Sequence, residues 1–278
     1  MIVLNAEHKL TQGVCLLVGN YDGIHLGHKR VISLARRNAL KRGLKTSVLS
    51  FEPHPLKVLD PTRAPKLIHS PFLKEALLDF FQVDYYVVQK FTPEFADSEA
   101  EAFVARLSQS IDFKILLVGS EFRFGSKRRG NTDLLRQLGP RFGFELVEID
   151  EVADGQGRIS STRIRRLLEQ GKIREMEKLL GHPYFLEGPV ERGKQIGRRL
   201  GTPTANLKVA NELIPKNGVY ASWLFVEKTW FPSVTNIGTR PTFGSKGVHV
   251  ETHVLDFSGQ IYGKNVVVCL KHFLRDEM

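Results

Sequence analysis

Residues 17–30 read L-V-G-N-Y-D-G-I-H-L-G-H-K-R, and the rest of the fold can be predicted outward from them. An apolar run at 14–18 stops at Gly19 and Asn20, which predicts a buried strand that ends in a turn. After His28 the apolar residues recur with helical spacing. A strand, a glycine-rich turn and a helix start predict a place where backbone N–H groups and the helix dipole hold a phosphate.

Two histidines give this turn its chemistry. His25 and His28 stand three positions apart at the predicted helix start, so they share a face and both imidazoles can donate to one phosphate chain. A single histidine would be more typical of a turn or a cap, whereas two that flank Gly27 favour phosphate binding. The Rossmann fingerprint and the P-loop pattern are both absent from this stretch.

The pattern H-x-G-H is the signature of the nucleotidylyl transferase superfamily. The longer stretch G-N-Y-D-G-I-H-L-G-H resembles the adenylyltransferase half of bacterial bifunctional riboflavin kinase/FAD synthetases. The resemblance implies a Rossmann-like domain in which His25 and His28 are catalytic. It also implies ATP contacts at Gly19, Asn20, Asp22 and Gly27.

Strands and helices alternate through the first half of the chain. Apolar patterns predict strands at 45–52, 85–88, 114–118 and 146–149 and helices at 73–81 and 95–107. This alternation predicts an α/β domain with a parallel sheet and right-handed crossovers. Ligands of such sheets bind at the carboxyl ends of the strands. The loops 19–28 and 119–131 both follow strands, so we expect them to meet there.

Two further loops in this half carry candidate ligand contacts. His54 lies between two prolines, which by themselves indicate only a turn that ends a strand. The loop 119–131 contains a basic run at 127–129 that is equally well explained as a solvated surface. The resemblance implies that His54 and Phe124 contact flavin and that Asn131 contacts ATP.

The stretch I-S-S-T-R-I-R-R at 159–166 predicts a capped helix start. Arg165 lies one helical turn beyond Ser161, so a hydroxyl and a guanidinium can bind the same phosphate. Capping alone would explain the Ser-Thr cluster, but I-S-S-T-x-I-R is also the second signature of the superfamily. The resemblance implies a catalytic role for Arg165 and ATP contacts at Ser161 and Thr162. A helix at 173–180 follows.

The pattern changes after Pro183. Short apolar runs separated by Gly, Pro and Asn predict a small antiparallel β-barrel, here the riboflavin kinase domain of the resemblance. We therefore predict domains at 1–183 and 184–278. Compared with the family, the second domain is expected to lack the usual C-terminal helix.

A glycine-rich basic stretch, R-G-K-Q-I-G-R-R-L-G-T-P-T-A-N-L, occupies 192–207. Alone it reads as a basic turn, yet it resembles the kinase motif G-x-P-T-A-N. Thr204 and Asn206 offer the hard oxygen ligands that Mg²⁺ prefers, and the resemblance implies that they hold the metal of MgATP. It also implies flavin binding at Arg240 and ATP binding at Gly193, Lys194, Gly197, Arg198 and Gly201.

Glu251 alternates with apolar residues in V-H-V-E-T-H-V-L-D. Without context, that pattern indicates only the polar face of a strand. The resemblance implies that Glu251 is the general base for the riboflavin 5′-hydroxyl, a role typically worth ~10²–10⁴ in rate.

Composition narrows the class of protein. The chain has 278 residues, 42% hydrophobic and 25% charged, which is typical of a globular protein of two domains. A membrane span and a signal peptide are not predicted, and the two cysteines are expected to be buried free thiols in a reducing cytoplasm. The net charge of +10 predicts anionic ligands, either nucleic acid or phosphorylated small molecules.

Together the motifs predict FAD synthesis by a bifunctional enzyme. The second half would phosphorylate riboflavin to FMN with MgATP, and the first would transfer AMP from ATP to FMN. Because of the expected missing helix, an adenylyltransferase with a weak or inactive kinase half is the alternative. A flavin carrier without activity and a tRNA-synthetase-like RNA binder are more remote. We expect no nucleic-acid or membrane partner and leave self-association open.

Overall fold

The computed structural model describes residues 1–193, 202–239 and 248–277. They form two compact units, one made of Met1–Pro65 and Lys74–Ile159, the other of Lys66–Leu73 and Ser160–Met278. The predicted boundary at Pro183 concerns the extent of the functional domains and stays a prediction. Within the described residues, no helix is long and apolar enough to cross a membrane.

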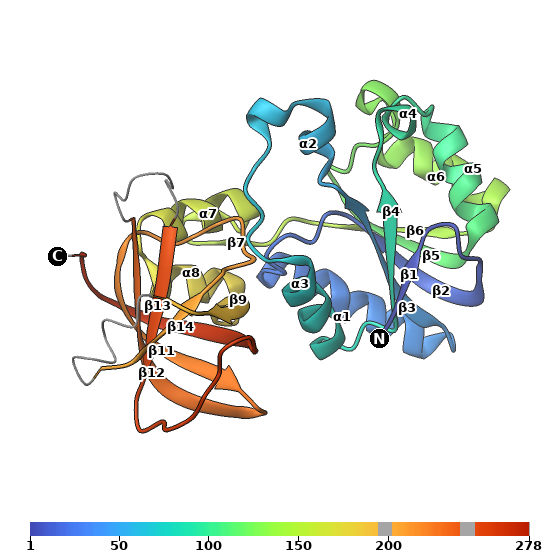
Figure 1. Ribbon diagram of the computed structural model, residues 1–278. Helices are drawn as coiled ribbons and strands as arrows, with labels where there is room; N and C mark the ends of the chain where they lie inside the picture. Colours follow the sequence, from blue (N-terminus) through green and yellow to red (C-terminus); the bar gives the residue numbers. More distant parts are fainter. Residues whose placement is uncertain (194–201, 240–247, 278) are drawn as a thin grey trace. The chain divides into compact units, whose positions relative to one another are not determined.

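The first unit is built on a parallel sheet of six strands in the order β1-β4-β3-β2-β5-β6 (Figure 1). This confirms the α/β prediction. The strands are β1 Ile2–Asn5, β2 Leu10–Val18, β3 Lys45–Glu52, β4 Tyr85–Lys90, β5 Ile111–Gly119 and β6 Glu145–Ile149. The helices are α1 Leu26–Lys41, α2 Pro55–Leu59, α3 Pro71–Phe80, α4 Pro93–Ala96, α5 Ala100–Ser110 and α6 Thr132–Phe142. A small hairpin, β7 Ala153–Asp154 and β8 Gly157–Arg158, follows.

Both faces of the sheet are buried, which explains why its central strands read as continuous apolar runs. Along β2, Val14, Leu16 and Val18 pack in one cluster with residues of α5 and α6. Cys15 and Leu17 point the other way and pack with residues of α1 and α3. The loops at 19–28 and 119–131 therefore start from neighbouring parallel strands, β2 and β5, at the same edge of the sheet.

Three local features differ from the sequence pattern. The single helix predicted at 95–107 is two helices, because Thr92 caps the short α4 and the chain leaves helical geometry at Glu99 before α5. The turn around His54 leads directly into α2, with Pro55 in its first turn. The structure also contains α6, for which the sequence analysis predicts no element.

The second unit contains the helices α7 Ser161–Glu169 and α8 Ile173–Leu180 and a closed antiparallel barrel. The barrel order is β10-β13-β12-β11-β14-β9, which confirms the predicted architecture. Its strands are β9 Tyr184–Glu191, β10 Thr204–Leu207, β11 Gly218–Val226, β12 Thr229–Thr239, β13 Val248–Val254 and β14 Asn265–Arg275. The strand β10 was not predicted, although it carries the two proposed metal ligands.

Candidate functional sites

The turn after β2 is organised by His25. His25 is the N-cap of α1, and its Nδ1 accepts a hydrogen bond of 3.4 Å from the backbone N–H of His28. Because Nδ1 is the acceptor, a neutral His25 ring carries its proton on Nε2 and can donate from that nitrogen. The same histidine thus starts the helix and carries a ring N–H of the kind that donates to a phosphate.

Gly27 is required by the way the His25 ring folds back on the helix start. A Cβ added at Gly27 would lie 2.9 Å from Cε1 and 3.0 Å from Nδ1 of His25. Any larger residue would therefore displace the ring. The rings of His25 and His28 stack, with centroids 3.8 Å apart and planes 15° from parallel. The glycine in H-x-G-H makes room for this pair of imidazoles.

His28 has an enclosed nitrogen that no described residue satisfies. Its Nδ1 is buried and has no hydrogen-bond partner within the described chain, while Tyr21 packs against the ring at a centroid distance of 4.8 Å. Burial, and then the charges of His25 and Lys74, hold the pKa of His28 well below its ordinary value. A buried polar atom without a partner is costly. The sequence prediction that both histidines share one face is confirmed.

The end of β3 brings a second pair of predicted residues together. Nδ2 of Asn20 lies 3.0 Å from Nε2 of His54, and the carbonyl of Asn20 accepts a hydrogen bond from Ser50 Oγ at 3.2 Å. The N–H of Gly19 donates to Leu49 and extends the ladder between β2 and β3. Asp22, in the same turn, is buried. Residues predicted for ATP and for flavin are therefore neighbours.

The loop after β5 gives its predicted residues structural partners. Asn131 caps α6, with its Oδ1 accepting from the N–H of Leu134 at 2.9 Å. The ring of Phe124 is buried in the core and stacks on Phe122 at 5.5 Å. Each residue thus has a role in the fold, and their contacts with ATP and flavin stay predictions.

The helix start at 160–166 forms as expected. Ser160 caps α7 by accepting from the N–H of Arg163 at 3.3 Å, so Ser161 and Thr162 lie in the first helical turn. Nε of Arg165 donates to the carbonyl of Lys66 at 2.8 Å, within the same compact unit. That bond restrains the direction of the guanidinium.

In the barrel, strand register assembles the kinase residues. Thr204 and Asn206 alternate with the inward-facing Ala205 on β10, and Asn206 lies directly opposite Glu251 on β13. Directly opposed side chains on one sheet face have Cβ atoms about 4.5–5.5 Å apart. A predicted metal ligand and the predicted base are therefore neighbours, each partly buried.

Gly193 packs closely against the side chain of Asn206. A Cβ there would lie 2.4 Å from Nδ2 of Asn206, so only glycine allows the chain to pass. Beside it is a pocket of about 720 Å³, lined by Thr204, Asn206 and side chains from the segment between β13 and β14. This volume is in the range typical of sites for small molecules.

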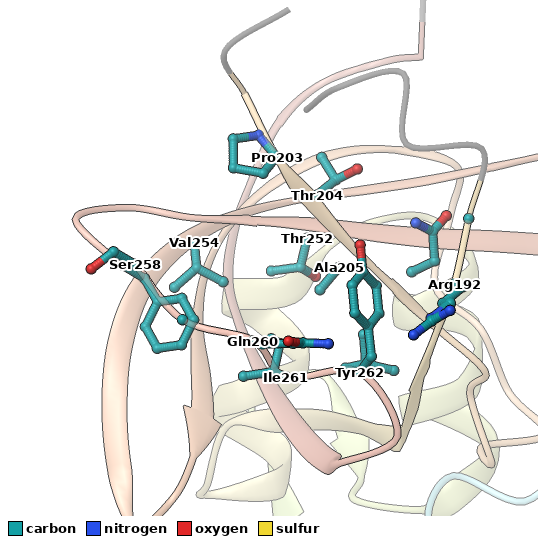
Figure 2. A pocket seen from close by; sticks show the side chains of 15 residues that line it. Arg192, Pro203, Thr204, Ala205, Thr252, Val254, Ser258, Gln260, Ile261 and Tyr262 are labelled. Atoms are coloured by element: carbon teal, nitrogen blue, oxygen red, sulfur yellow. The ribbon is translucent and has the colours of Figure 1, made fainter. Parts of the chain in front are cut away.

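Several pocket residues were not identified from the sequence. Figure 2 shows Arg192 beside the ring of Tyr262, and the guanidinium carbon lies 5.8 Å from the ring centroid. Thr252 and Val254 of β13 also line the pocket, together with Gln260. These residues follow ordinary strand and turn patterns, and no linear signal separates them from structural residues.

The remaining predicted residues, Lys194, Gly197, Arg198, Gly201 and Arg240, lie outside the described part of the chain. Among the described residues there is no group of three or more His, Cys, Asp and Glu side chains that could hold a metal ion. A metal at the barrel site would therefore depend on amide and hydroxyl oxygens and on the phosphates of its nucleotide. Thr204 and Asn206 on one face fit that chemistry.

Comparison with known families gives a consistent result over the whole chain. The family model described as FAD synthetase matches residues 7–163, and the model described as riboflavin kinase matches residues 180–278. A bifunctional riboflavin kinase/FMN adenylyltransferase of Escherichia coli K12 is 35% identical over all of this chain and 90% of its own length. The protein of that name from Haemophilus influenzae is 36% identical over 99% of this chain and 90% of its own length.

A solved structure agrees with this fold. The crystal structure titled macrolide-efflux protein from Streptococcus pneumoniae has a TM-score of 0.91 and 30% sequence identity. The match covers 100% of this chain and 92% of the other. The likeness therefore includes both the parallel-sheet unit and the barrel.

Proposed function

Because the chain belongs to the family of bifunctional riboflavin kinase/FMN adenylyltransferases, we propose that each of its two reactions depends on its own set of residues. The enzyme makes FMN from riboflavin in its carboxyl-terminal half and FAD from FMN in its amino-terminal half. The observation that carries this assignment is the separation of the two polar clusters. The stacked His25–His28 pair lies in the sheet unit, and the opposed Asn206–Glu251 pair lies in the barrel.

In the amino-terminal reaction, a phosphate oxygen of FMN attacks the α-phosphorus of ATP, and the bond to the β-phosphate breaks to release pyrophosphate. The charge that develops on the phosphates needs preorganised donors. Nε2 of His25 and the imidazole of His28 supply them. The backbone N–H groups at the start of α1 add the positive end of the helix dipole.

The residues of α7 belong to the predicted phosphate-binding set. Nε of Arg165 is bonded to the Lys66 carbonyl, and a guanidinium is a donor group that matches the geometry of a phosphate. Ser161 and Thr162 add a hydroxyl and N–H groups from the first turn. Substituting Ser161, Thr162 or Arg165 and measuring ATP binding would test their contribution.

In the carboxyl-terminal reaction, the 5′-hydroxyl of riboflavin attacks the γ-phosphorus of ATP and ADP leaves. Glu251 accepts the hydroxyl proton as the new O–P bond forms. Thr204 and Asn206 would hold Mg²⁺, which neutralises phosphate charge when bound. Gly193 lets the chain pass close to Asn206, and the adjoining pocket has room for the nucleotide.

The proposal includes MgATP in both reactions, cytoplasmic localisation and no nucleic-acid partner. The cytoplasmic localisation is supported by buried free thiols at Cys15 and Cys269. Burial raises their thiol pKa values to about 12 and about 11. Protonated buried thiols of this kind are unreactive and need no disulfide partner.

The direct test is chromatography of products after incubation with riboflavin, ATP and Mg²⁺, and separately with FMN. Riboflavin should yield FMN and then FAD, and added FMN should yield FAD with pyrophosphate. FAD from FMN but no FMN from riboflavin would restrict the function to adenylyl transfer. Absence of both products would overturn the assignment.

A further inference from the structure

Lys74, a buried lysine, affects the charge state of His28 but has no assigned part in the reactions described above. Lys74 of α3 is 8% exposed, and burial lowers its pKa, an effect that Glu52 and Asp22 partly oppose. Burying an ammonium group is costly unless it is paired and hydrogen-bonded. An unbranched apolar side chain of similar size, such as methionine, would fill most of the space at lower cost.

The ammonium group is bonded to two strands of the sheet. Nζ of Lys74 donates to Ser50 Oγ at 3.2 Å and to Tyr86 Oη at 3.3 Å, and it lies 3.6 Å from Oε1 of Glu52. Tyr86 Oη in turn donates to Glu52 at 3.1 Å. The cation is therefore fixed from three directions and can act as a rigid support.

One branch of this network reaches the turn itself. Ser50 Oγ donates to the carbonyl of Asn20 at 3.2 Å, and the side chain of Asn20 lies 3.0 Å from the ring of His54. The path from Lys74 through Ser50 therefore reaches Asn20, the first residue after Gly19. Through the side chain of Asn20 it also reaches the neighbouring Pro53–Pro55 turn. The other branch runs through Tyr86 to Glu52, and Tyr86 also contacts Ser50, but only Ser50 is bonded to Asn20.

We propose that Lys74 is a positioning residue for adenylyl transfer, which fixes the Ser50 hydroxyl and thereby holds Asn20 and the Asn20–His54 pair in place. The inference rests on the FMN adenylyltransferase activity proposed above. It assigns Lys74 no contact with ATP or FMN. Its effect passes through Asn20, and this makes the inference testable by combining substitutions.

The two branches of the network provide matched variants. Lys74→Met removes the charge and leaves an unbranched side chain one atom shorter, and Ser50→Ala breaks the link to Asn20 while the cation stays. Tyr86→Phe removes the other neutral partner of Lys74 and its contact with Ser50, but leaves both the Lys74–Ser50 and the Ser50–Asn20 bonds in place. Each variant is compared with Asn20→Ala and with the double variants Lys74→Met/Asn20→Ala and Ser50→Ala/Asn20→Ala. Circular dichroism and thermal unfolding report whether the sheet unit of each variant is folded.

We expect kcat/KM for FAD formation from FMN to fall tenfold to a hundredfold in Lys74→Met and in Ser50→Ala, because small displacements of a binding turn have effects of about this size. Tyr86→Phe should stay within about twofold of the wild type. Each double variant should be no slower than Asn20→Ala alone, since residues that act through one another are not additive.

Multiplicative losses in the double variants, or wild-type FAD formation by Ser50→Ala, would overturn the inference. If Lys74→Met does not fold, Ser50→Ala and its double variant decide the outcome alone. A wild-type chain that makes no FAD would instead contradict the proposed function. The two failures are therefore distinguishable.

Discussion

The sheet unit and the barrel place reactive side chains in opposite ways. In the sheet unit, His25 and His28 are neighbours in sequence, and their rings are held by a helix cap, by each other and by the space that Gly27 leaves. In the barrel, Asn206 and Glu251 are far apart in sequence and meet only through the register of β10 and β13. The first site is local and the second is a product of strand pairing.

This difference predicts different sensitivities. A local cluster is disturbed mainly by changes to its own few residues. A site made by register also depends on the residues that control how closely the strands and their connections approach.

Glu251→Gln should lower FMN formation by about 10²–10⁴, because glutamine keeps the size of the side chain but cannot accept the proton. FAD formation from added FMN should not change, since Glu251 is not among the residues proposed for adenylyl transfer. Steady-state rates of both reactions on one preparation measure this. The matched control is His249→Gln, which lies on the same face of β13 two residues away and should leave both rates intact. Equal rates for Glu251→Gln and wild type would remove Glu251 from the mechanism.

His28→Ala should reduce FAD formation by about 10²–10³, the usual effect of losing one preorganised donor. Riboflavin phosphorylation should continue at the wild-type rate. An exposed histidine of the same unit, His8, provides the control substitution His8→Ala. A His28→Ala enzyme with full FAD output would contradict the phosphate-binding role of the turn.

Gly193→Ala tests whether the barrel site depends on close approach. The added Cβ would push the Asn206 amide aside, and a displacement of this order should lower kinase activity about 10- to 100-fold. Gly155→Ala, where the added carbon meets open space, is the control. The Mg²⁺ concentration needed for half-maximal FMN formation should rise in Gly193→Ala. An unchanged requirement would separate Gly193 and Asn206 from the metal.

The smallest expected effect is the pH dependence of stability. The pKa of His28 is depressed in the folded state. Above pH 6.5 the ring is therefore neutral in both the folded and the unfolded chain, and it adds no pH dependence to the free energy of unfolding. Below pH 6.5 His28 binds a proton in the unfolded chain but not in the folded chain, so the free energy of unfolding falls. By pH 5.5 the loss should be on the order of 1 kcal/mol.

His28→Gln lacks this group and should lose correspondingly less stability than the wild type between pH 7.5 and 5.5. Urea unfolding at the two pH values, followed by fluorescence, measures the difference. Parallel losses in the two proteins would mean that His28 is not buried as a neutral ring.

The alternation of strands and helices, the barrel after residue 183 and the position of each motif could all be predicted from the sequence. These features depend on local periodicity and on turn residues, which are visible in short stretches. The stacked histidines and the cap at Ser160 are also local features of this kind. Their partners lie within four residues along the chain.

Other features required the tertiary structure. The side chain of Phe124 is buried, and β10 forms a strand where the sequence indicated a turn. Neither follows from a local pattern, because burial depends on which helices cover the sheet and a short strand depends on its partners.

The same reason applies to the pairs that form the sites. Asn20 meets His54, Lys74 meets Ser50, and Asn206 meets Glu251 through sheet topology and register. A shift of one residue in a strand would turn every side chain to the other face. The sequence therefore determined which chemical groups are available, and only the packing of the strands and helices decided which of them come within hydrogen-bond distance.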